Sequence, residues 1–544
     1  MRFLPASDRA LLLELQDLQQ TMSVYRHVAA QQLPCMEDMV PAARTLLVQF
    51  DPYTMSAAEL RTQLQLLAEQ ALQREQLAVT GQGRLVEIPV HYTGEDLPEV
   101  AELLGMTVAQ LIECHTAQPY DAAFAGFAPG FVYLSGGANL QVPRRKSPRT
   151  RVPAGAVALG GSFSAVYPSA SPGGWQLIGV TDVPMWDLQR AEPAYIQPGF
   201  RVQFVDAARS PVTVSLPVAK KYEQKQPLAQ IQQALPAIEI VSIGLQTLMQ
   251  DAGRQGLSGL GISASGALDL PAMHAANRLV GNPVDAPVLE NLMGQLQLRS
   301  HGATTLAVTG AQVDVTVHSA QGASWPVSSH APIALNDGDR LQLHAPAAGM
   351  RCYVAVRGGW QVEPVLGSCA TDTLAQVGPP ALQVGQHIAV GHAIPTNQLC
   401  AVELGGLAQP ALPRAGELVT LDVVLGPRTD WFTPAAVQTF LAQEWSVTPQ
   451  SNRVGIRLQG AQALERAQHQ ELPSEGTVTG AIQVPVNGQP VLFLADHPLT
   501  GGYPVIAAVA SYHLPLAAQI PVGCRIRFRV VESCLAAAER KDLE

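Results

Sequence analysis

The segment Pro198-Gly-Phe-Arg-Val-Gln-Phe204 indicates most directly how this chain folds. Its glycine is followed two residues later by an arginine, and apolar and polar residues then alternate. The same arrangement recurs in Asp337-Gly-Asp-Arg-Leu-Gln-Leu343 and in Val522-Gly-Cys-Arg-Ile-Arg-Phe528. Alternation with a period of two is typical of a half-buried strand, and a glycine turn can lead into such a strand. The recurrence predicts related β-barrel modules in both halves of the chain.

A second pair of segments points the same way. Pro172-Gly-Gly-Trp175 and Thr500-Gly-Gly-Tyr503 each follow an earlier segment with a glycine. These earlier segments are Pro153-Ala-Gly-Ala-Val157 and Ser474-Glu-Gly-Thr-Val478. The alternative is that any β protein reuses glycine turns, and the sequence leaves both interpretations open.

Composition excludes several classes of protein. The chain has 544 residues, of which 47% are hydrophobic and 14% charged, so it is not a disordered chain. At roughly 100–200 residues per domain it is expected to hold about three to five domains. Its 46 Gly and 42 Pro show no three-residue period, which excludes collagen and favours many turns between short strands. A net charge of −10 without a long basic run argues against a nucleic-acid or anionic-membrane surface.

The cysteines and apolar runs predict a soluble, cytoplasmic protein. Seven cysteines without a CxxC pair argue against a disulfide framework or a zinc site and fit a reducing compartment. Glu14 interrupts the apolar run 11–13, so we expect no signal peptide. The uncharged stretch 477–495 contains Pro485 and Pro490, which favour strands and a turn over a membrane span.

The fold class predicted from these patterns is mainly β with an α+β N-terminal part. In the N-terminal part, a strand is expected at 46–50 and a helix from the Ser56 cap through Leu72. A strand at 85–92 and helices near 97–104 and 108–114 should follow, the last capped by Thr107. Beyond these, short β runs separated by turns predict barrels. In the second half, helices are expected only at 269–280, at 434–444 and after 533.

We divide the chain into five parts. They are a small α+β domain at 1–84, a barrel domain at 85–217, a linker at 218–236, a β-rich half at 237–535 with two barrel modules, and a tail at 536–544.

A basic patch is the first candidate site. It holds Arg144, Arg145, Lys146, Arg149 and Arg151, and Pro148 prevents it from forming one helical face. Guanidinium groups bind carboxylates or phosphates through paired hydrogen bonds, so the patch is a candidate anion site. The alternatives are a solvated basic loop and arginines that pair across an interface.

Further candidates lie outside the patch. The carboxylates and the histidine proposed for proton transfer or for Mg²⁺ are His115, Asp251, Asp269, Glu475 and Asp496. The groups proposed for substrate or ATP, besides the patch, are Arg254, Arg453, Gly173, Gly174, Gly501 and Gly502, because arginines and the amides of glycine pairs can hold anionic oxygens. His115 is equally explained as a buried structural histidine, and Asp251 could simply pair with Arg254. Standard signatures such as GxxxxGK[ST], HExxH and GxSxG are absent from the sequence.

Several longer strings resemble a known pair of families. Residues 1–215 resemble the KipI family, also called allophanate hydrolase subunit 1 or the B subunit of 5-oxoprolinase. The strings that carry this resemblance are GFAPGF (126–131), PRRKSPRTRVPAG (143–155) and YPSASPGGWQLIG (167–179). Residues 238–535 resemble the KipA family, allophanate hydrolase subunit 2 or the C subunit of 5-oxoprolinase. Here the strings are QDAGRQGLSGLGISASGALD (250–269), ANRLVGNP (276–283), YVAVRGGWQVEPVLGS (353–368) and SEGTVTGAIQVPVNGQPVLFLADHPLTGGYP (474–504).

The resemblance implies a fusion of the B and C types, with cyclophilin-like β-barrel domains in both halves. It further implies an ATP-dependent cyclic amide hydrolase that opens 5-oxoproline to glutamate together with a LamB/YcsF-type A subunit. The implied co-substrate is ATP, with Mg²⁺, and a homodimer is possible. The alternatives are hydrolysis of a urea-derived amide such as allophanate and regulation of a sensor histidine kinase.

The sequence departs from the family pattern in places. Gly130-Phe-Val-Tyr-Leu134 replaces the usual GFPYL, and Asp496-His-Pro498 replaces an Asp-Arg-Gln before the TGGYP string. These departures lie close to the candidate residues, so they bear on which substrate the chain accepts.

Overall fold

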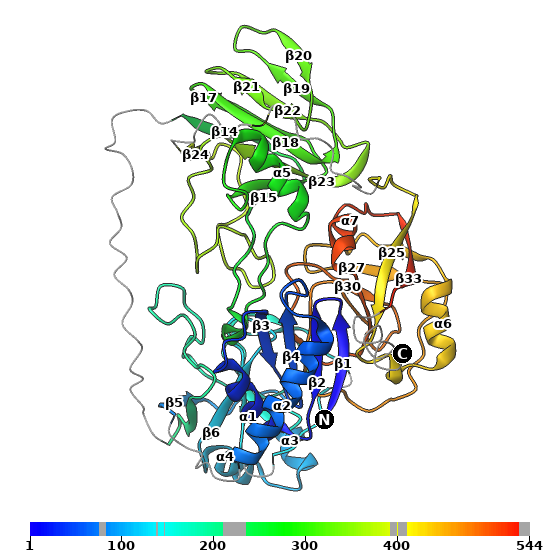
Figure 1. Cartoon of the computed structure of the whole chain (residues 1–544). Coiled ribbons are helices and arrows are strands. Elements are labelled where there is room, and N and C mark those ends of the chain that lie inside the picture. The colour runs from blue at the N-terminus through cyan, green and yellow to red at the C-terminus, as the bar shows by residue number, and fades with distance from the viewer. Residues whose placement is uncertain are drawn as a thin grey trace.

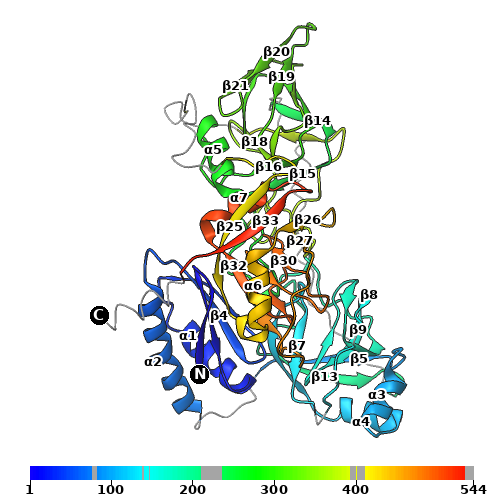
Figure 2. The same ribbon diagram turned by 90° about the vertical axis from the view of Figure 1, so that its right-hand side faces the viewer.

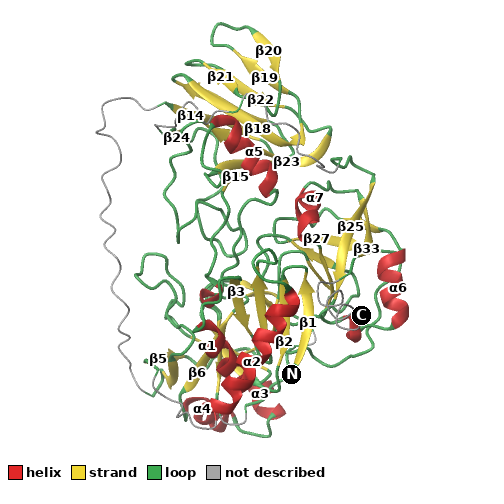
Figure 3. Cartoon of the chain, viewed as in Figure 1, coloured by secondary structure: helices red, strands yellow, loops and turns green. Residues whose placement is uncertain are grey.

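The structure is a computed structural model of the chain. It describes residues 1–75, 83–137, 140–145, 147–209, 236–391, 400 and 411–532. Strands dominate, and the helices pack against the sheets (Figures 1 and 3). The predicted linker, apart from Pro236, and the predicted tail lie outside the described residues.

The N-terminal sheet is a small α+β unit, as the sequence predicts. Its elements are β1 (Arg2–Ser7), β2 (Ala10–Glu14), α1 (Leu18–Ala29), β3 (Met36–Pro41), β4 (Thr45–Phe50) and α2 (Ala57–Glu75). The antiparallel strands lie in the order β1-β2-β4-β3, and the buried faces of the two helices pack in one core with β2 and β4. Asp17 caps α1 by accepting from the amide of Gln20. The local patterns predicted β4 and α2 but not α1 or the β1–β2 hairpin.

The first barrel follows directly. Its elements are β5 (Leu85–Val90), α3 (Leu97–Leu103), α4 (Val108–Thr116), β6 (Tyr120–Ala125), β7 (Val132–Ser135), β8 (Arg149–Val152), β9 (Ala156–Gly160), β10 (Phe163–Val166), β11 (Ser171–Gly173), β12 (Gln176–Val180) and β13 (Arg201–Asp206). Seven strands form the sheet β12-β9-β10-β7-β6-β13-β5. A bridge between His91 and Val180 joins its two ends, so the sheet is nearly closed. Thr107 caps α4 with a capping box, as predicted.

The middle sheets occupy the upper part of Figure 1. Their elements are β14 (Ala237–Ile243), β15 (Gln246–Gln250), η1 (Ser258–Leu260), α5 (Leu270–Val280), β16 (Val288–Leu292), β17 (Leu296–His301), β18 (Thr304–Gln312), β19 (Val315–His318), β20 (Ser324–Val327), β21 (Ile333–Leu335), β22 (Arg340–Leu343), β23 (Ala348–Val356) and β24 (His387–Ala389). One sheet has the order β20-β19-β22-β17-β14-β24 and the other the order β15-β16-β23-β18-β21. Both contribute to one apolar core.

The last barrel is a closed ring of seven strands. Its elements are β25 (Leu418–Leu425), η3 (Thr429–Trp431), α6 (Pro434–Ala442), β26 (Trp445–Val447), β27 (Gly455–Gln459), β28 (Glu475–Gly476), β29 (Ala481–Gln483), β30 (Val491–Phe493), β31 (Thr500–Gly501), β32 (Val505–Val509), η4 (Ser511–His513), α7 (Leu514–Ala518) and β33 (Arg525–Val530). The ring runs β25-β32-β29-β30-β27-β26-β33. The sequence predicted two barrel modules in the second half, whereas the described residues hold one closed barrel preceded by the paired middle sheets.

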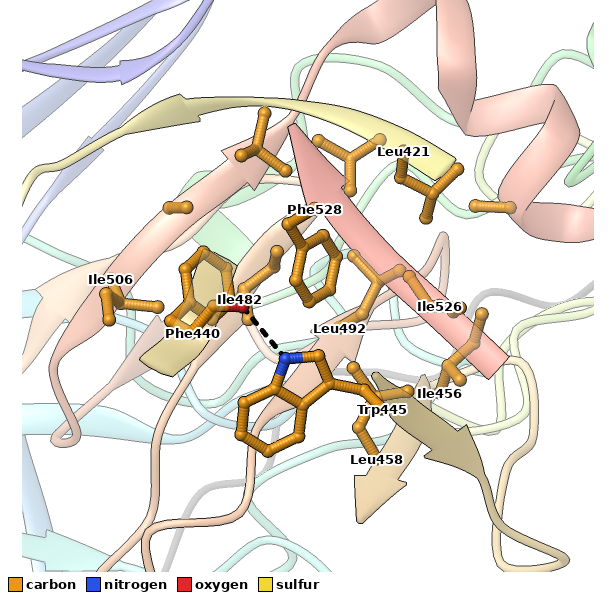
Figure 4. Packing of buried hydrophobic residues seen from close by; sticks show 14 of the residues in the cluster. Leu421, Phe440, Trp445, Ile456, Leu458, Ile482, Leu492, Ile506, Ile526 and Phe528 are labelled. Carbon is orange, nitrogen blue, oxygen red and sulfur yellow. Dashed lines mark hydrogen bonds between the residues drawn. The ribbon is translucent and has the colours of Figure 1, made fainter. Parts of the chain in front are cut away.

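Aromatic side chains fill the core of the last barrel. Trp445 is fully buried, and its indole NH donates to the carbonyl of Phe440 at 2.9 Å (Figure 4). The ring of Phe440, on α6, stacks on Phe528 of β33 with centroids 4.6 Å apart. The helix therefore contributes its aromatic side chain to the interior that the strands enclose.

The recurring segments occupy matching places in the two barrels. Gly199 and Gly523 both adopt positive φ, +92° and +87°, and each leads into a strand that begins at the following arginine. These strands, β13 and β33, each pair in parallel with the first strand of their own barrel, β5 or β25. The glycine pairs match too, because β11 pairs with β8 and β31 pairs with β28. The third recurrence forms β22 of the middle sheets.

The last barrel lies between the middle sheets and the first two parts of the chain (Figure 2). It therefore contacts the N-terminal sheet, the first barrel and the middle sheets. Among the described helices, none combines the length and apolar character needed to cross a membrane.

Candidate functional site

Three loops from distant parts of the sequence meet beside the last barrel. They are the loop 126–131 between β6 and β7, the loop 251–269 between β15 and α5, and the loop 495–504 around β31. The amide of Gly130 donates to the carbonyl of Leu260 at 3.0 Å. A Cβ on Gly126 would collide with Thr500, and a Cβ on Gly261 would collide with the carbonyl of Ala128. Glycine is required at these positions because the loops approach so closely. We call this meeting point the junction.

Hydroxyl groups line the part of the junction that faces the first barrel. The phenol of Tyr133 lies 3.4 Å from the hydroxyl of Thr500 and accepts a hydrogen bond from Ser474 at 3.3 Å. All three side chains are buried. Tyr133 is part of an aromatic cluster that includes Phe131 and Trp175, so its ring is held in place while its oxygen faces the last barrel.

Arg144 joins the basic patch to this hydroxyl cluster. Its Nη2 donates to Ser474 at 3.0 Å, and its Nε lies 2.8 Å from Oε1 of Glu471. A Cβ on Gly502 would collide with its guanidinium, so this glycine leaves the space that Arg144 occupies. Of the predicted groups, the structure thus brings Arg144 and Gly502 together.

The other arginines of the patch bind a different carboxylate. Arg145 and Arg149 donate to the same oxygen of Asp96, at 2.8 Å and 2.7 Å. The second Asp96 oxygen accepts from the amide of Leu177 at 2.6 Å, and the side chain is only 4% exposed. The hydrogen bond to Asp96 raises the pKa of Arg149 above its usual value. Arg145 and Arg149 thus pair with an acid of their own barrel, whereas Arg144 pairs with Glu471 across the contact with the last barrel. Arg151 is exposed on β8, and Lys146 lies outside the described residues.

Asp496 lies at the centre of a buried charge network. Its two oxygens accept from Nε and Nη2 of Arg453, both at 3.0 Å. Ser265 donates to Oδ1 at 2.6 Å, and Thr373 donates its amide and its hydroxyl to Oδ2. Burial alone would raise the pKa of Asp496, but the charge of Arg453 and these hydrogen bonds outweigh it and lower the pKa. The carboxylate is therefore charged and has donors on both oxygens.

Arg453 extends the network into the middle sheets. It forms an ion pair with Glu290 and donates to the carbonyl of Gly266 at 2.6 Å. Glu290 also accepts from the phenol of Tyr353 at 2.9 Å. Arg351 lies 3.8 Å from the same carboxylate, so two buried arginines share it. A cavity of about 100 Å³ opens beside these groups.

Asp269 caps the helix α5. Its Oδ1 accepts from the amide of Ala272 at 3.1 Å, and its Oδ2 accepts from Gln519 at 2.8 Å. Burial raises the pKa of this carboxyl above its usual value. The sequence predicts this same position for Asp269, at the start of a helix.

Asp251 and Arg254 have separate partners. Asp251 accepts from Ser368, from the amide of Cys369 and from the amide of Gly253, which fixes the loop after β23. Arg254 donates to the carbonyl of Ala370. Its Nε and Nη1 are buried and have no hydrogen-bond partner among the described residues, and burial lowers its pKa. The two side chains therefore bind different partners, and the structure gives no hydrogen bond between them.

Asp372 lies in the same region as Arg254 and has an unusual acidity. Burial, followed by the negative charge of Asp496, raises its pKa to about 6. Its Oδ2 accepts from Ser263 at 3.3 Å, and its Oδ1 accepts from two backbone amides. The protonation of Asp372 therefore changes within about one unit of neutral pH. It was not among the predicted residues, because nothing in the string around position 372 indicates burial beside a second carboxylate.

His115 lies apart from the junction, inside the first barrel. Its ring is completely buried, stacks on Phe204 at 4.3 Å, and contacts Tyr92 through Nδ1 at 2.7 Å and Ser164 through Nε2 at 3.0 Å. Burial lowers its pKa to about 3, so it is neutral at pH 7. This is the environment of a buried structural histidine, the alternative that the sequence left open.

The remaining predicted groups divide between two places. Gly173 adjoins the phenol of Tyr167, and the carbonyl of Gly174 accepts from the amide of Arg145 at 2.7 Å. Gly501 pairs with Glu475 across the β28–β31 ribbon. A Cβ on Gly501 would collide with Gln483, so close packing explains this glycine.

A polar cavity of about 350 Å³ lies where the N-terminal sheet meets the last barrel. In its wall, Arg428 donates to Glu475 through both Nε and Nη2 and forms a further pair with Glu14 at 2.9 Å. Burial raises the pKa of Glu475, and Arg428 partly offsets that rise. Ser474 belongs to this cavity as well as to the hydroxyl cluster, so the cavity adjoins the junction.

The predicted carboxylates do not form a ready Mg²⁺ site. Mg²⁺ requires carboxylate oxygens with room for several waters. The oxygens of Asp251, Asp269, Glu475 and Asp496 are instead occupied by protein donors. Among the described residues, one group of metal-binding side chains has its ligand atoms within 4.8 Å of one another: Glu239, His301 and His387. Arg299 donates to the same Glu239 oxygen that contacts His301, which explains this surface group as ion pairing.

Comparison with known proteins assigns both halves to one family. Residues 1–196 match the carboxyltransferase domain, subdomain C and D, and residues 260–530 match the carboxyltransferase domain, subdomain A and B. The chain is 39% identical over 298 residues to the C subunit of 5-oxoprolinase from Escherichia coli (strain K12), covering 54% of this chain and 90% of that protein. It is 46% identical over 128 residues to the B subunit of 5-oxoprolinase from Haemophilus influenzae, covering 23% of this chain and 60% of that protein.

A solved structure covers nearly the whole chain. The crystal structure of TTHA0988 is 31% identical in sequence and superposes with a TM-score of 0.79, over 96% of this chain and 99% of that one. The order of the two halves within one chain is thus shared with an experimental structure.

Proposed function

The chain belongs to the carboxyltransferase-domain family that includes the B and C subunits of 5-oxoprolinase, as a fusion of the KipI and KipA types, and we propose that it is the B–C component of an ATP-dependent 5-oxoprolinase. In this proposal it opens 5-oxoproline to glutamate together with a LamB/YcsF-type A subunit. The relatives from Escherichia coli and Haemophilus influenzae are subunits, which supports an assembly of more than one kind of chain.

The chemistry requires activation of the lactam. An amide carbonyl is a poor electrophile, so water does not open the ring at a useful rate. Transfer of the γ-phosphoryl group of ATP to the amide oxygen would convert that oxygen into a leaving group. Water then adds to the carbon, and the ring C–N bond breaks with the nitrogen taking up a proton, which leaves an acyl phosphate. A second water hydrolyses this acyl phosphate to glutamate and inorganic phosphate.

The observation that carries the proposal is the junction itself. Loops from the B-like half and the C-like half meet there at hydrogen-bonding distance, through Gly130 and Leu260, and through Tyr133 and Thr500. A site at an interface between domains is a common place for a small-molecule substrate. Asp372, whose pKa is raised to about 6, is our candidate for moving a proton in this region.

ATP and Mg²⁺ enter only as part of the proposal. The carboxylates suggested for Mg²⁺ already have protein donors, so no residue of this chain is assigned to the metal. We propose that the LamB/YcsF-type partner supplies much of the nucleotide site, and that the complex is cytoplasmic, where ATP is available. A homodimer of the fused chain is a further part of the proposal.

The experiment is glutamate release from 5-oxoproline, measured with and without ATP and with a purified LamB/YcsF-type partner. We expect release that depends on both ATP and the partner. A partner that is active beside another B–C pair, yet releases no glutamate with this chain, would contradict the proposal. Allophanate as substrate, and binding to a sensor histidine kinase, would then be measured in the same preparations.

The anion role of the patch arginines is tested separately with Arg149→Ala. If Arg149 binds substrate or nucleotide, its removal should weaken the apparent affinity for 5-oxoproline or ATP. If the affinity for both compounds is unchanged, Arg149 does not bind either of them, and its role is limited to the ion pairs with Asp96 and Glu95.

A further inference from the structure

The cavity between the N-terminal sheet and the last barrel has four carboxylates in its wall, and each one is already paired with an arginine. Glu14 pairs with Arg2 and Arg428, and Asp430 pairs with Arg2 at 3.2 Å. Glu475 pairs with Arg428. Three of the four acids are thus held by the two arginines Arg2 and Arg428.

The fourth carboxylate is paired by the basic patch. Glu471 lies 2.8 Å from Nε of Arg144, which reaches it from the first barrel. Every carboxylate of the wall therefore has an arginine at ion-pair distance within the protein.

Arg44 is the exception among the cationic groups of this wall. Its side chain is exposed, lines the cavity, and has no carboxylate or other hydrogen-bond partner among the described residues. When Arg44 and Arg144 are counted with Arg2 and Arg428, the cationic groups balance the four carboxylates. The wall therefore carries no net negative charge that would repel an anionic ligand. The guanidinium NH groups of Arg44 are available to donate hydrogen bonds to such a ligand.

The backbone around Arg44 is well anchored. Its carbonyl accepts from the amide of Leu15 at 2.8 Å, and the amide of Ala43 donates to the carbonyl of Ser474 at 3.2 Å. The amide of Ala42 donates to the carbonyl of Thr45 at 2.8 Å and closes the turn. The turn between β3 and β4 is thus tied to the β28 segment of the last barrel, which holds Arg44 at the cavity.

We propose that this cavity binds the carboxylate of a small, singly charged substrate and that Arg44 is the residue that holds it. The identity of the probe rests on the proposed function, in which the substrate is 5-oxoproline. Guanidinium groups bind carboxylates through two parallel hydrogen bonds, which fixes orientation as well as position. A volume of about 350 Å³ lies at the small end of ligand pockets and suits such a molecule.

The cavity also has groups suited to the rest of such a substrate. Gln468 and Gln470 lie in its wall and are linked by a hydrogen bond of 3.1 Å. Amide side chains can donate to and accept from a lactam. Ser474 connects the cavity to Tyr133 and hence to the junction.

The test compares 5-oxoproline with 5-oxoprolinamide, in which a neutral amide replaces the carboxylate. Binding of both to the full chain, with the LamB/YcsF-type partner present, is measured by isothermal titration calorimetry. We expect the native chain to prefer the acid by roughly 10- to 100-fold, since a charge-assisted bidentate contact contributes about that factor. Arg44→Ala should abolish the preference, and Arg44→Lys should keep part of it.

Arg209→Ala is the matched control. Arg209 is a well-exposed arginine of the first barrel that pairs with Asp206, and its removal should leave the preference intact. Melting temperatures of all variants should agree with that of the native chain, so that a change in binding is not a change in folding. The inference is overturned if Arg44→Ala still prefers the acid, if the native chain binds acid and amide equally, or if it binds neither.

The outcome is separable from that of the proposed function. Arg44-dependent binding without any glutamate release would keep the carboxylate site and reject the reaction. Glutamate release with an unchanged KM for 5-oxoproline in Arg44→Ala would keep the reaction and reject the site. A changed KM for ATP alone would also reject it, because the anion bound by Arg44 would then be a phosphate.

Discussion

The two barrels share a plan but differ in what they bury. In each, a glycine with positive φ leads into a closing strand that runs parallel to the first strand, and each has a two-stranded ribbon next to a glycine pair. The first barrel buries a neutral histidine among aromatic rings. The last barrel adjoins the buried charge network that contains Asp496 and Arg453.

This difference follows from where each barrel lies. The first barrel contacts the last barrel through the hydroxyl groups of Tyr133, Thr500 and Ser474, and through the ion pair of Arg144 with Glu471. The last barrel lies between the other parts and supplies charged partners in both directions, Arg453 toward the middle sheets and Arg428 toward the N-terminal sheet. One barrel thus holds its buried polar side chain within itself, whereas the other connects neighbouring parts of the chain through buried charges.

The largest expected effect comes from breaking the network of the last barrel. Asp496→Ala removes the carboxylate that compensates Arg453, leaving a completely buried cation with less than its full set of partners. The free energy of unfolding should fall by about 3–5 kcal/mol, the usual cost of leaving a buried charge unpaired. Urea denaturation followed by tryptophan fluorescence measures this.

The matched control for that variant lies in the first barrel. Asp121→Ala removes an exposed carboxylate that pairs with Arg201 at 3.9 Å. Its effect on stability should be close to zero. A loss in Asp496→Ala no larger than the loss in Asp121→Ala would show that the network contributes no more to stability than an exposed pair.

The second prediction concerns the neutral histidine of the first barrel. Its pKa is about 3 in the folded chain and about 6.5 when unfolded. As the pH falls, His115 therefore gains its proton in the unfolded state before it does so in the folded state. The stabilisation that His115 provides is complete above about pH 6.5. It should be lost toward pH 3 with a slope of up to about 1.4 kcal/mol per pH unit.

His115→Gln isolates this contribution, because carboxyl groups titrate over part of the same range. The difference in unfolding free energy between native chain and variant should shrink as the pH is lowered from about 7 to about 4, the range in which the unfolded histidine gains its proton. A difference that stays constant with pH would mean that His115 is not kept neutral by burial.

The third prediction tests the contact between the two barrels. Gly126→Ala places a methyl group closer to the side chain of Thr500 than van der Waals contact allows. We expect a loss of about 1–3 kcal/mol, as for other overpacked sites. Differential scanning calorimetry would show a lower melting temperature.

Gly259→Ala is the control at the same junction. It has nothing within 4 Å of the added Cβ and no positive φ, so it should melt like the native chain. Equal melting temperatures for Gly126→Ala and Gly259→Ala would mean that the two barrels are not in tight contact at Thr500.

The smallest effect is expected on the outer surface of the last barrel. Glu444 pairs with Arg525 and with Arg527, the latter at 2.9 Å, and both arginines are nearly half exposed. Glu444→Ala should change the unfolding free energy by less than about 1 kcal/mol, and high salt should reduce the change further. A loss comparable to that of Asp496→Ala would contradict the contrast between exposed and buried pairs.

Local patterns predicted several elements well. The cap at Thr107 predicted α4, because a helix start depends on residues three positions apart. The helix expected at 269–280 is α5, and the structure shows that Asp269 caps it. The glycine–arginine recurrence predicted strands that the structure places equivalently in both barrels. The helix α1 was missed, although Asp17 caps it, since its short apolar stripe carries a weak periodic signal.

The candidate site was only partly predictable. The sequence motifs that contain Gly126, Gly261 and Thr500 were identified. The sequence did not predict that these three loops contact one another. Partners that lie far apart in sequence were missed, such as Asp96 for the patch arginines and Glu290 for Arg453. The raised pKa of Asp372 was missed because it depends on burial and on the charge of Asp496, which is remote in the chain.

The sequence by itself determined the β-rich class, the family and the repeated strand–glycine plan, since these depend on spacing along the chain. Only the tertiary structure decided which arginine forms an ion pair with a carboxylate and which does not. Arg149 and Arg44 are both ordinary arginines beside turns in the sequence. One is bound by Asp96 and the other faces a cavity whose acids are all paired, because electrostatic pairing depends on distance in space and not on separation along the chain.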